Sequence, residues 1–329
     1  MKKNALNAAS LAIADWTERD WQRVCFLNAE PLPDLDSHLK EKLICEQGNR
    51  PSFLALEKLG YNAIPIIESE ERFSASLVLA GRNRKVNEAN LSRTWNMTKP
   101  GGLVVVAGGK TEGIASLRKT ASGKTQIAES FSKFHSVVFT LQRNNVALDI
   151  PDLSRRIDGY DVSAGMFSAD GPDKGSVLLT QYFNERIKGR VADLGSGWGY
   201  LSAELLKCSS EVEAIDLFEA DYLSLSAARK NLQVSDRETT FQWCDVTTEF
   251  PKRPYHWVIM NPPFHSGRAA EPELGQRFIS TAASTLPNGG RLLMVANRNL
   301  PYEANLNRLF RSVQILGEEQ GFKVFEAVK

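Results

Sequence analysis

The tetrapeptide Asn261-Pro262-Pro263-Phe264 directly follows the apolar run His256–Met260. An Asn side-chain oxygen and a neighbouring backbone carbonyl can accept both N–H groups of an amine whose lone pair is delocalised into a conjugated plane. Such an amine attacks a methyl sulfonium poorly unless electron density returns to its nitrogen. Pro262 keeps the loop rigid because its φ is locked, and Phe264 offers a ring on which a flat substrate can stack. The motif predicts methylation of a base amine or a carboxamide nitrogen, with Asn261, Pro262 and Phe264 as the catalytic residues.

A glycine-rich segment, Val191–Gly199, lies about sixty residues earlier and reads as a strand, a loop and the start of a helix. Glycines let the backbone approach a ligand, and a helix N-terminus offers unpaired N–H groups. The acidic residue before the glycines suits a cationic amino-acid moiety better than a pyrophosphate. The alternative is a tight strand–helix turn. We expect a cofactor to lie here on Asp193, Gly195, Ser196, Gly197 and Gly199.

Two more acidic positions follow at the ends of predicted strands. Asp216 and Glu219 compete to accept from ribose hydroxyls, and the register of the following helix favours Glu219. Asp245 could accept from an adenine amino group, or it could simply be a turn or helix N-cap Asp. Ligands of α/β proteins bind at the carboxyl edge of the sheet, so the three strand ends together are more specific than any one of them.

The second half of the chain alternates β-rich runs with helical patterns, which indicates an α/β fold with a mainly parallel sheet. The predicted strands are Arg190–Leu194, Val212–Phe218, Thr240–Cys244, Trp257–Met260, Arg291–Ala296 and Gly321–Ala327, the last pairing antiparallel with a strand near Val313–Leu316. The predicted helices are Gly199–Cys208, Asp221–Gln233, Glu273–Leu286 and Tyr302–Phe310.

The first half repeats part of this layout. A strand at Ser76–Ala80, a helix at Val86–Met97 and a Pro-Gly-Gly turn precede a strand at Leu103–Ala107, the same order as around Trp257–Ala296. An internal duplication explains this order, although any two α/β domains can share such an order of strand, helix, turn and strand. The first copy has no glycine loop after Arg23–Leu27, so we interpret it as a degenerate twin without a cofactor site.

Length and composition favour two ordinary globular domains, 1–150 and 151–329. The second begins with a polar segment to Gly175, in which Gly165–Ser168 and Gly171–Ser176 are predicted as loops, followed by a helical stretch at Val177–Arg186. Residues 81–150 hold eleven Lys/Arg against four Asp/Glu, whereas residues 151–329 hold twenty against twenty-three. This basic excess predicts either a phosphate-binding surface or only a solvated face.

Several other interpretations are excluded or set aside. The four cysteines are scattered without metal-ligand spacing, which indicates a reducing cytoplasm and no structural metal. Membrane-spanning runs are absent, and the N-terminal stretch is too polar for a signal peptide. Ser122–Thr125 imitates the end of a P-loop, but Arg118 occupies the required earlier glycine position. His265 could touch substrate or be an ordinary loop histidine, and Trp198 could pack beside a cofactor or fill the core.

With these motifs in place, residues 151–329 resemble the class I S-adenosylmethionine-dependent methyltransferases, and in particular the bacterial rRNA guanine-N2-methyltransferases of the small-subunit methyltransferase C type. The similar pieces are Gly165–Ser168, Asp170, Asp173–Ser176, the glycine loop, Asn261–His265, Val295–Asn297, Leu300–Tyr302 and Phe322–Phe325. The resemblance implies two tandem Rossmann-like methyltransferase domains, of which the first is degenerate and structural or RNA-binding. The family often has Asp where this chain has Glu219.

The resemblance implies S-adenosylmethionine as cofactor and an exocyclic guanine N2 amine of 16S rRNA, or of the small ribosomal subunit, as substrate. We expect a cytoplasmic monomer. Three alternatives remain: a 23S rRNA guanine-N2 methyltransferase, a protein glutamine N-methyltransferase, and a non-catalytic RNA-binding or assembly factor. The intact glycine loop, Asn261 and Phe264 argue against the last, because a binding protein has no use for that combination.

Overall fold

A computed structural model describes residues 2–68, 70, 72–233, 236–250, 253–263, 265–266, 269–270 and 272–329. The chain divides into two compact units, Met1–Ser154 and Arg155–Lys329. The sequence had placed the boundary near residue 150. In the described part of the chain, every helix is too short or too polar to cross a membrane.

The first unit contains, in chain order, α1 (Lys2–Ala12), η1 (Ala14–Glu18), β1 (Val24–Leu27), α2 (Ser37–Lys42), β2 (Leu43–Glu46), α3 (Arg50–Lys58), β3 (Asn62–Ile64), β4 (Phe73–Leu79), α4 (Arg84–Met97), β5 (Thr98–Gly109), α5 (Ile114–Ser122), β6 (Ile127–Lys133) and β7 (Ser136–Gln142). The strand β8 (Ser154–Ile157) begins at the boundary.

The second unit continues with β9 (Tyr160–Ser163), α6 (Lys174–Thr180), β10 (Gly189–Leu194), α7 (Tyr200–Cys208), β11 (Val212–Glu219), α8 (Tyr222–Asn231), β12 (Glu238–Trp243), β13 (Trp257–Met260), β14 (His265–Ser266), β15 (Ala269–Ala270), α9 (Pro272–Thr285), β16 (Arg291–Asn297), α10 (Glu303–Leu309), β17 (Ser312–Glu319) and β18 (Phe322–Val328).

Both units are built on seven-stranded sheets of the same topology. The strand orders are β3-β2-β1-β4-β5-β7-β6 and β12-β11-β10-β13-β16-β18-β17. In each sheet the first five strands are parallel, and the last two pair antiparallel. Two tandem Rossmann-like α/β domains are therefore confirmed, and the shared order supports the duplication.

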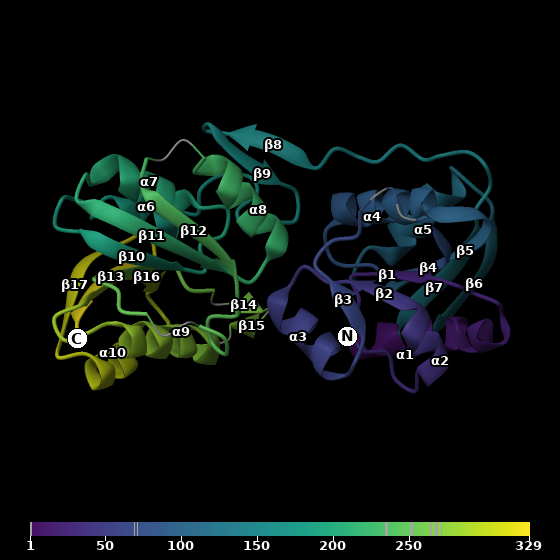
Figure 1. Ribbon diagram of the computed structural model, residues 1–329, viewed down its shortest axis with the longest axis horizontal. Helices are drawn as coiled ribbons and strands as arrows, with labels where there is room; N and C mark the ends of the chain where they lie inside the picture. The colour runs from purple at the N-terminus through teal and green to yellow at the C-terminus, as the bar shows by residue number, and fades with distance from the viewer. Residues whose placement is uncertain are drawn as a thin grey trace. The chain divides into compact units, whose positions relative to one another are not determined.

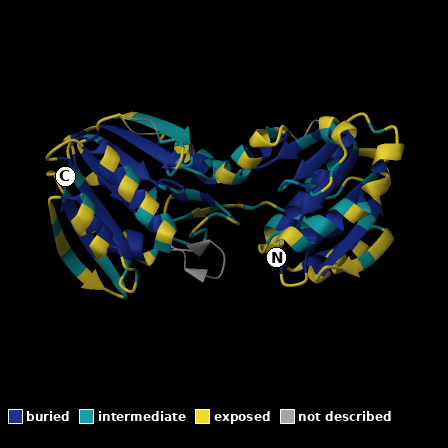
Figure 2. Cartoon of the chain, turned by 90° about the horizontal axis from the view of Figure 1, so that it is seen from below, coloured by how far each residue is buried: buried dark blue, intermediate teal, exposed yellow. Residues whose placement is uncertain are grey.

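The second unit has three layers, with α6, α7 and α8 on one face of the sheet and α9 and α10 on the other (Figure 1). Successive residues of a strand point to opposite faces, so Val191 packs with the first group of helices and Ala192 with the second. Figure 2 shows the result within each unit: the strands are mostly buried, whereas the helices carry exposed outer faces. Strands that are apolar on both faces are typical of such parallel sheets.

The strands and helices predicted above for the second half are present within two residues of their predicted ends, with two exceptions. The strand β17 continues to Glu319, three residues beyond its predicted end. The helix α6 begins at Lys174 and ends at Thr180, so the prediction of a helix at Val177–Arg186 was wrong at both ends.

The bounds of α6 have local causes. The helix begins early because the Asp173 carboxylate accepts from the Ser176 N–H as N-cap. It ends at Thr180, after which the N–H groups of Gln181 and Tyr182 donate to the carbonyls of Leu178 and Leu179 in a tighter turn. The helix therefore starts inside the segment that the sequence had assigned to a loop.

The polar segment that opens the second unit contains a hairpin that the sequence did not predict, and this hairpin precedes both stretches predicted as loops. The strands β8 and β9 form a two-stranded sheet there. Asn231, the last residue of α8, joins β9 to the glycine loop, because its amide group donates to the carbonyls of Asp161 and Trp198. This hairpin therefore helps to hold the loop that follows β10.

Candidate active site

The glycine loop connects β10 to α7 at the carboxyl edge of the sheet. Gly195, Gly197 and Gly199 all have positive φ, between 55° and 88°, which L side chains rarely adopt. A Cβ on Gly199 would lie 2.6 Å from Leu232 Cδ1, so that glycine serves close packing. A Cβ on Gly197 would meet nothing within 4 Å, so this stretch of backbone faces open space in which a ligand can lie.

Asp193 lies beneath the loop and is fully buried. The Ser202 hydroxyl of α7 donates to its Oδ2 at 2.6 Å, while Asp193 Oδ1 and the Ser196 hydroxyl have no hydrogen-bond partner among the described residues. Burial raises the pKa of Asp193 to about 7, against the lowering effect of Ser202. A buried carboxylate oxygen without a partner is costly, and a cationic group placed above it would relieve that cost.

Glu219 is the acidic residue at the end of the second strand. Its Oε2 accepts from the Gly197 N–H at 2.7 Å, and its Oε1 accepts from the Asp221 N–H at 2.8 Å. Burial raises the pKa of Glu219 to about 7, although these N–H donors act in the opposite direction. Each carboxylate oxygen has a second lone pair, which can accept from a hydroxyl group of a bound ligand.

Asp216, the competing candidate, lies mid-strand and is fully buried away from this edge. Arg190 Nη1 lies 3.0 Å from both of its carboxylate oxygens, and the hydroxyls of Tyr255 and Thr240 donate to it at 2.8 and 2.7 Å. Arg253 completes the cluster, with its Nη1 3.4 Å from Asp216 Oδ2. The Asp216 carboxylate is occupied by these internal partners, so Asp216 is structural.

Asn261 follows β13, the strand next to β10. Its Nδ2 donates to Asp173 Oδ2 at 2.8 Å and to the Ser176 hydroxyl at 2.9 Å. Pro262 is buried and Pro263 is exposed. A Cβ on Gly195 would lie 4.0 Å from Pro263 Cδ, so the two loops are adjacent. Phe264 and the side chain of His265 lie outside the described residues.

One small cavity, of about 50 Å³, connects these loops. It is lined by Phe167, Ser168, Asp173, Ser176, Gly195, Ser196, Gly197, Trp198, Tyr200, Leu201 and Asn261. The cavity therefore brings together three stretches that are distant in sequence, namely 165–176, 195–201 and 261. Phe167, which also lines the cavity, is 62% exposed, and its ring offers a flat ligand a surface on which to stack.

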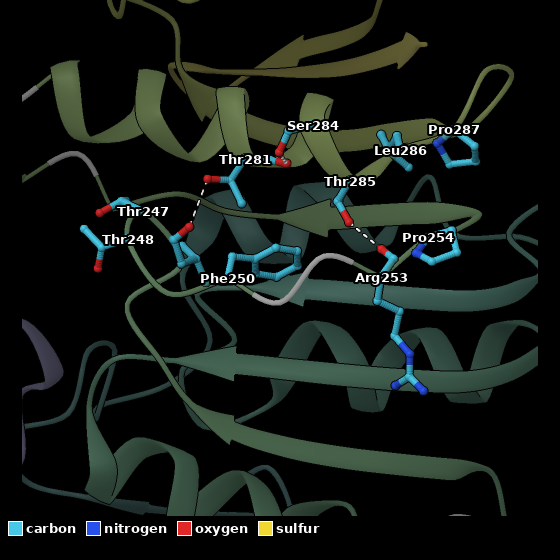
Figure 3. A pocket seen from close by; sticks show the side chains of 11 residues that line it. Thr247, Thr248, Phe250, Arg253, Pro254, Thr281, Ser284, Thr285, Leu286 and Pro287 are labelled. Carbon is cyan, nitrogen blue, oxygen red and sulfur yellow. Dashed lines mark hydrogen bonds between the residues drawn. The ribbon is translucent and has the colours of Figure 1, made fainter.

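A larger groove, of about 670 Å³, lies between α9 and the segment that joins β12 to β13 (Figure 3). Thr281 and Thr285 donate to the backbone carbonyls of Val246 and Arg253 across it. Arg253 is the one charged side chain among its described lining residues, and it extends away from the others toward Asp216 (Figure 3). Volume alone does not make it a reactive site.

Asp245 and Trp198 are two residues for which the sequence left alternative roles open. Asp245 lies two residues after β12, where its carboxylate accepts from the Thr247 N–H and from the hydroxyls of Thr247 and Thr248. These contacts are those of the turn Asp proposed as its alternative role, and contact with adenine stays a prediction.

Trp198 is 4% exposed and packs against Tyr160 and Tyr200, so it belongs to the core while also lining the cavity.

The first unit lacks the equivalent arrangement among its described residues. Asn28 follows β1 where Gly195 follows β10, and Glu46 ends β2 as Glu219 ends β11. The Glu46 carboxylate is held by Arg93 of α4 at 2.7 and 2.9 Å and by the Ile67 N–H. Glu46, the counterpart of Glu219 in the first unit, is thus neutralised internally. Ser122 and Gly123, from the P-loop-like stretch, end α5 rather than begin a helix.

Known protein families add a second line of evidence. The family model described as methyltransferase small domain matches residues 161–326, just over half of the chain. The chain belongs to this methyltransferase family. A relative named ribosomal RNA small subunit methyltransferase C, from Sodalis glossinidius, is 37% identical over 164 residues, which are 50% of this chain and only 46% of that relative. The protein of the same name from Shewanella halifaxensis is 29% identical over 80% of each chain.

Among solved structures, the T. thermophilus 16S rRNA N2 G1207 methyltransferase in complex with AdoMet and guanosine aligns with 94% of this chain and 89% of its own. The TM-score is 0.80 at 24% identity, which shows that the two proteins share the two-domain fold.

The site of this methyltransferase fits S-adenosylmethionine. The unpartnered Asp193 Oδ1 suits the cationic amino-acid end, Gly197 leaves space above the loop, and Glu219 retains lone pairs for ribose hydroxyls. When bound, the cofactor supplies a methyl group on a positively charged sulfur.

The sequence assigned no role to three parts of this site, although Phe167 and Asp173–Ser176 belong to the segments that carry the family resemblance. Ser202 holds Asp193 from α7, Phe167 stands exposed at the cavity, and Asp173 with Ser176 contacts Asn261. The sequence could have predicted the N-cap at Asp173, because an Asp three residues before a Ser is a helix N-cap pattern. Nothing in the sequence could have predicted that Asp173 and Ser176 contact Asn261, more than eighty positions away.

Proposed function

We propose that this protein transfers a methyl group from S-adenosylmethionine to the exocyclic N2 amine of a guanine in rRNA, and that this guanine belongs to the 16S rRNA of the small subunit. The observation that carries the proposal is that Asn261 and the glycine loop line one cavity. In this proposal an acceptor for an amine lies beside the glycine loop, which holds the methyl donor. The names of the relatives support the rRNA substrate.

Asn261 and the carbonyl of Pro262 hold the amine by its two hydrogens and direct its lone pair toward the methyl group. A bond forms between nitrogen and the methyl carbon while the sulfur–carbon bond breaks, and the nitrogen then releases a proton. Positioning and electrostatics supply most of the rate enhancement. Phe264 would stack on a guanine extruded from the RNA, and the exposed Phe167 is a second flat surface near the same cavity.

The first unit supports RNA rather than protein as substrate. The basic residues that follow the carboxyl ends of β4 and β5, among them Arg82, Lys85 and Lys110, are exposed. Exposed Lys and Arg side chains bind a phosphate backbone independently of its sequence. We propose that residues 1–150 serve as a structural and RNA-binding domain, that 151–329 is the catalytic domain, and that the protein acts as a monomer in the cytoplasm.

The test is methyl transfer from labelled S-adenosylmethionine to separated small subunits, large subunits, free rRNA and a protein extract. Asn261→Ala should lower kcat by about 10²- to 10³-fold, as loss of one oriented polar group in a reaction centre does, and should leave cofactor affinity nearly unchanged. Label recovered as N2-methylguanosine from small-subunit RNA supports the proposal. Label only on large-subunit RNA or on protein overturns the substrate, and equal losses of cofactor affinity and turnover overturn the role of Asn261.

A further inference from the structure

The amide group of Asn261 is held from one side by two acceptors of another segment. Its Nδ2 lies 2.8 Å from Asp173 Oδ2 and 2.9 Å from the Ser176 hydroxyl. Both acceptors belong to the N-cap and first turn of α6, whereas Asn261 follows β13. Both segments belong to the same family resemblance, but nothing in the sequence indicated a contact between them.

These contacts determine which way the amide faces. A carboxylate only accepts hydrogen bonds, so the group next to Asp173 must be the NH₂ end of Asn261. Because the Asp173 carboxylate cannot donate, the amide cannot turn over without losing that hydrogen bond and placing its oxygen against a negative charge. The side-chain oxygen is therefore left to face away from α6 and to accept from a substrate.

We propose that Asp173 and Ser176 are positioning residues, which hold Asn261 with its oxygen presented to the substrate so that the site takes an N–H donor and rejects a carbonyl. This inference rests on the proposed role of Asn261. A negative charge on the N–H side also polarises the amide and makes its oxygen a stronger acceptor. That favours the nitrogen as it becomes positive during transfer.

The first turn of α6 is rigid enough to do this. Asp173 Oδ2 also accepts from the Ser176 N–H at 3.1 Å as N-cap. A Cβ on Gly175 would lie 3.0 Å from the ring of Phe322 in β18, so the turn packs directly on the sheet. Asp173 and Ser176 are thus fixed relative to β13 by the core rather than by the loop.

Two substitutions at one position separate capping from positioning. Ser and Asn both serve as N-caps in place of Asp. Asn is as long as Asp and can present one oxygen to both Ser176 and Asn261, whereas Ser is too short to reach Asn261. If Asp173 were only a cap, Asp173→Ser and Asp173→Asn would behave alike.

The experiment measures kcat with the methyl acceptor that wild-type enzyme labels, cofactor affinity by calorimetry, and Tm. We expect Asp173→Ser to lower kcat by about 10- to 100-fold, the range for a hydrogen bond to a charged group. Asp173→Asn and Ser176→Ala should lower it by about 3- to 10-fold, and cofactor affinity should stay within about 3-fold in all three. Asp36→Ser, at the N-cap of α2 in the first unit, is the matched control for a changed cap and should keep full kcat.

Equal kcat values for Asp173→Ser and Asp173→Asn would overturn the inference, as would cofactor affinity falling in step with kcat. Wild-type enzyme that labels only protein would instead overturn the proposed RNA substrate. The ranking of the variants can then be measured on that protein acceptor, so the two failures are distinguishable.

Discussion

Asp193→Asn should stabilise the protein at high pH while weakening the cofactor site. Asp193 is fully buried, and its pKa is about 7 because burial disfavours the charged form. The folded state therefore binds a proton more tightly than the unfolded state, in which an Asp titrates near its ordinary value. The unfolding free energy of the wild type must fall as pH rises from about 4 to 7, and the full penalty remains above that window.

The magnitude follows from the two pKa values. The difference between 3.8 and about 7 corresponds to about 4 kcal/mol above pH 7. The Ser202 hydroxyl can still donate to the side-chain oxygen after Asp193→Asn, so that hydrogen bond is kept. The new NH₂ group has no acceptor in the place of the unpartnered Oδ1, which costs about 1–3 kcal/mol. A net gain of about 2 kcal/mol at pH 8 remains.

Urea unfolding at pH 5 and pH 8 measures this without the cofactor. The advantage of Asp193→Asn over wild type should grow by about 2–3 kcal/mol between the two pH values, which is independent of the cost of the unpaired amide. Asp149→Asn, which removes an exposed carboxyl group, is the control. A difference that stays constant between pH 5 and pH 8 would refute the reasoning. In the same variant, S-adenosylmethionine affinity should fall by about 10- to 100-fold through the loss of a charged partner.

Three further substitutions follow from packing. Gly197→Ala should weaken cofactor binding more than it lowers Tm, because its Cβ enters the open space above the loop. Gly199→Ala should mainly lower Tm, because its Cβ lies 2.6 Å from Leu232 Cδ1. Both variants share the strain of a positive φ, about 1–2 kcal/mol, so equal effects of the two variants on binding and on Tm would contradict the prediction. Arg93→Met should destabilise the first unit by about 3–5 kcal/mol in urea unfolding by leaving the buried Glu46 carboxylate without its cationic partner, with unchanged cofactor affinity in calorimetry.

How much of this could be predicted depended on the range of the interaction. Strands such as β13 were predictable because an apolar run ended by a turn signal needs no distant information. Glu219 was preferred over Asp216 for the same reason, since the start of the next helix sets the register locally. The helix α6 was misplaced because the N-cap at Asp173 was taken as part of a loop.

The contacts that assemble the site were beyond a single sequence. Asn261 and Asp173 are 88 positions apart, and Asp193 and Ser202 meet only because α7 folds back on β10. A polar residue shows what it can donate or accept, but its partner depends on packing. Phe167 illustrates the same limit, because nothing in its neighbours predicts that an aromatic ring stays exposed.

The position of β18 has a consequence for synthesis. This strand lies between β16 and β17 inside the second sheet, so Phe322–Val328 fills an internal place rather than an edge. Its counterpart β7, at Ser136–Gln142, lies between β5 and β6 in the first sheet. During translation the first sheet can close once residue 142 has left the ribosome, while the second must wait for residue 328. The first sheet can therefore be completed before the second, and the sheet that carries the site is closed only when β18 has been made.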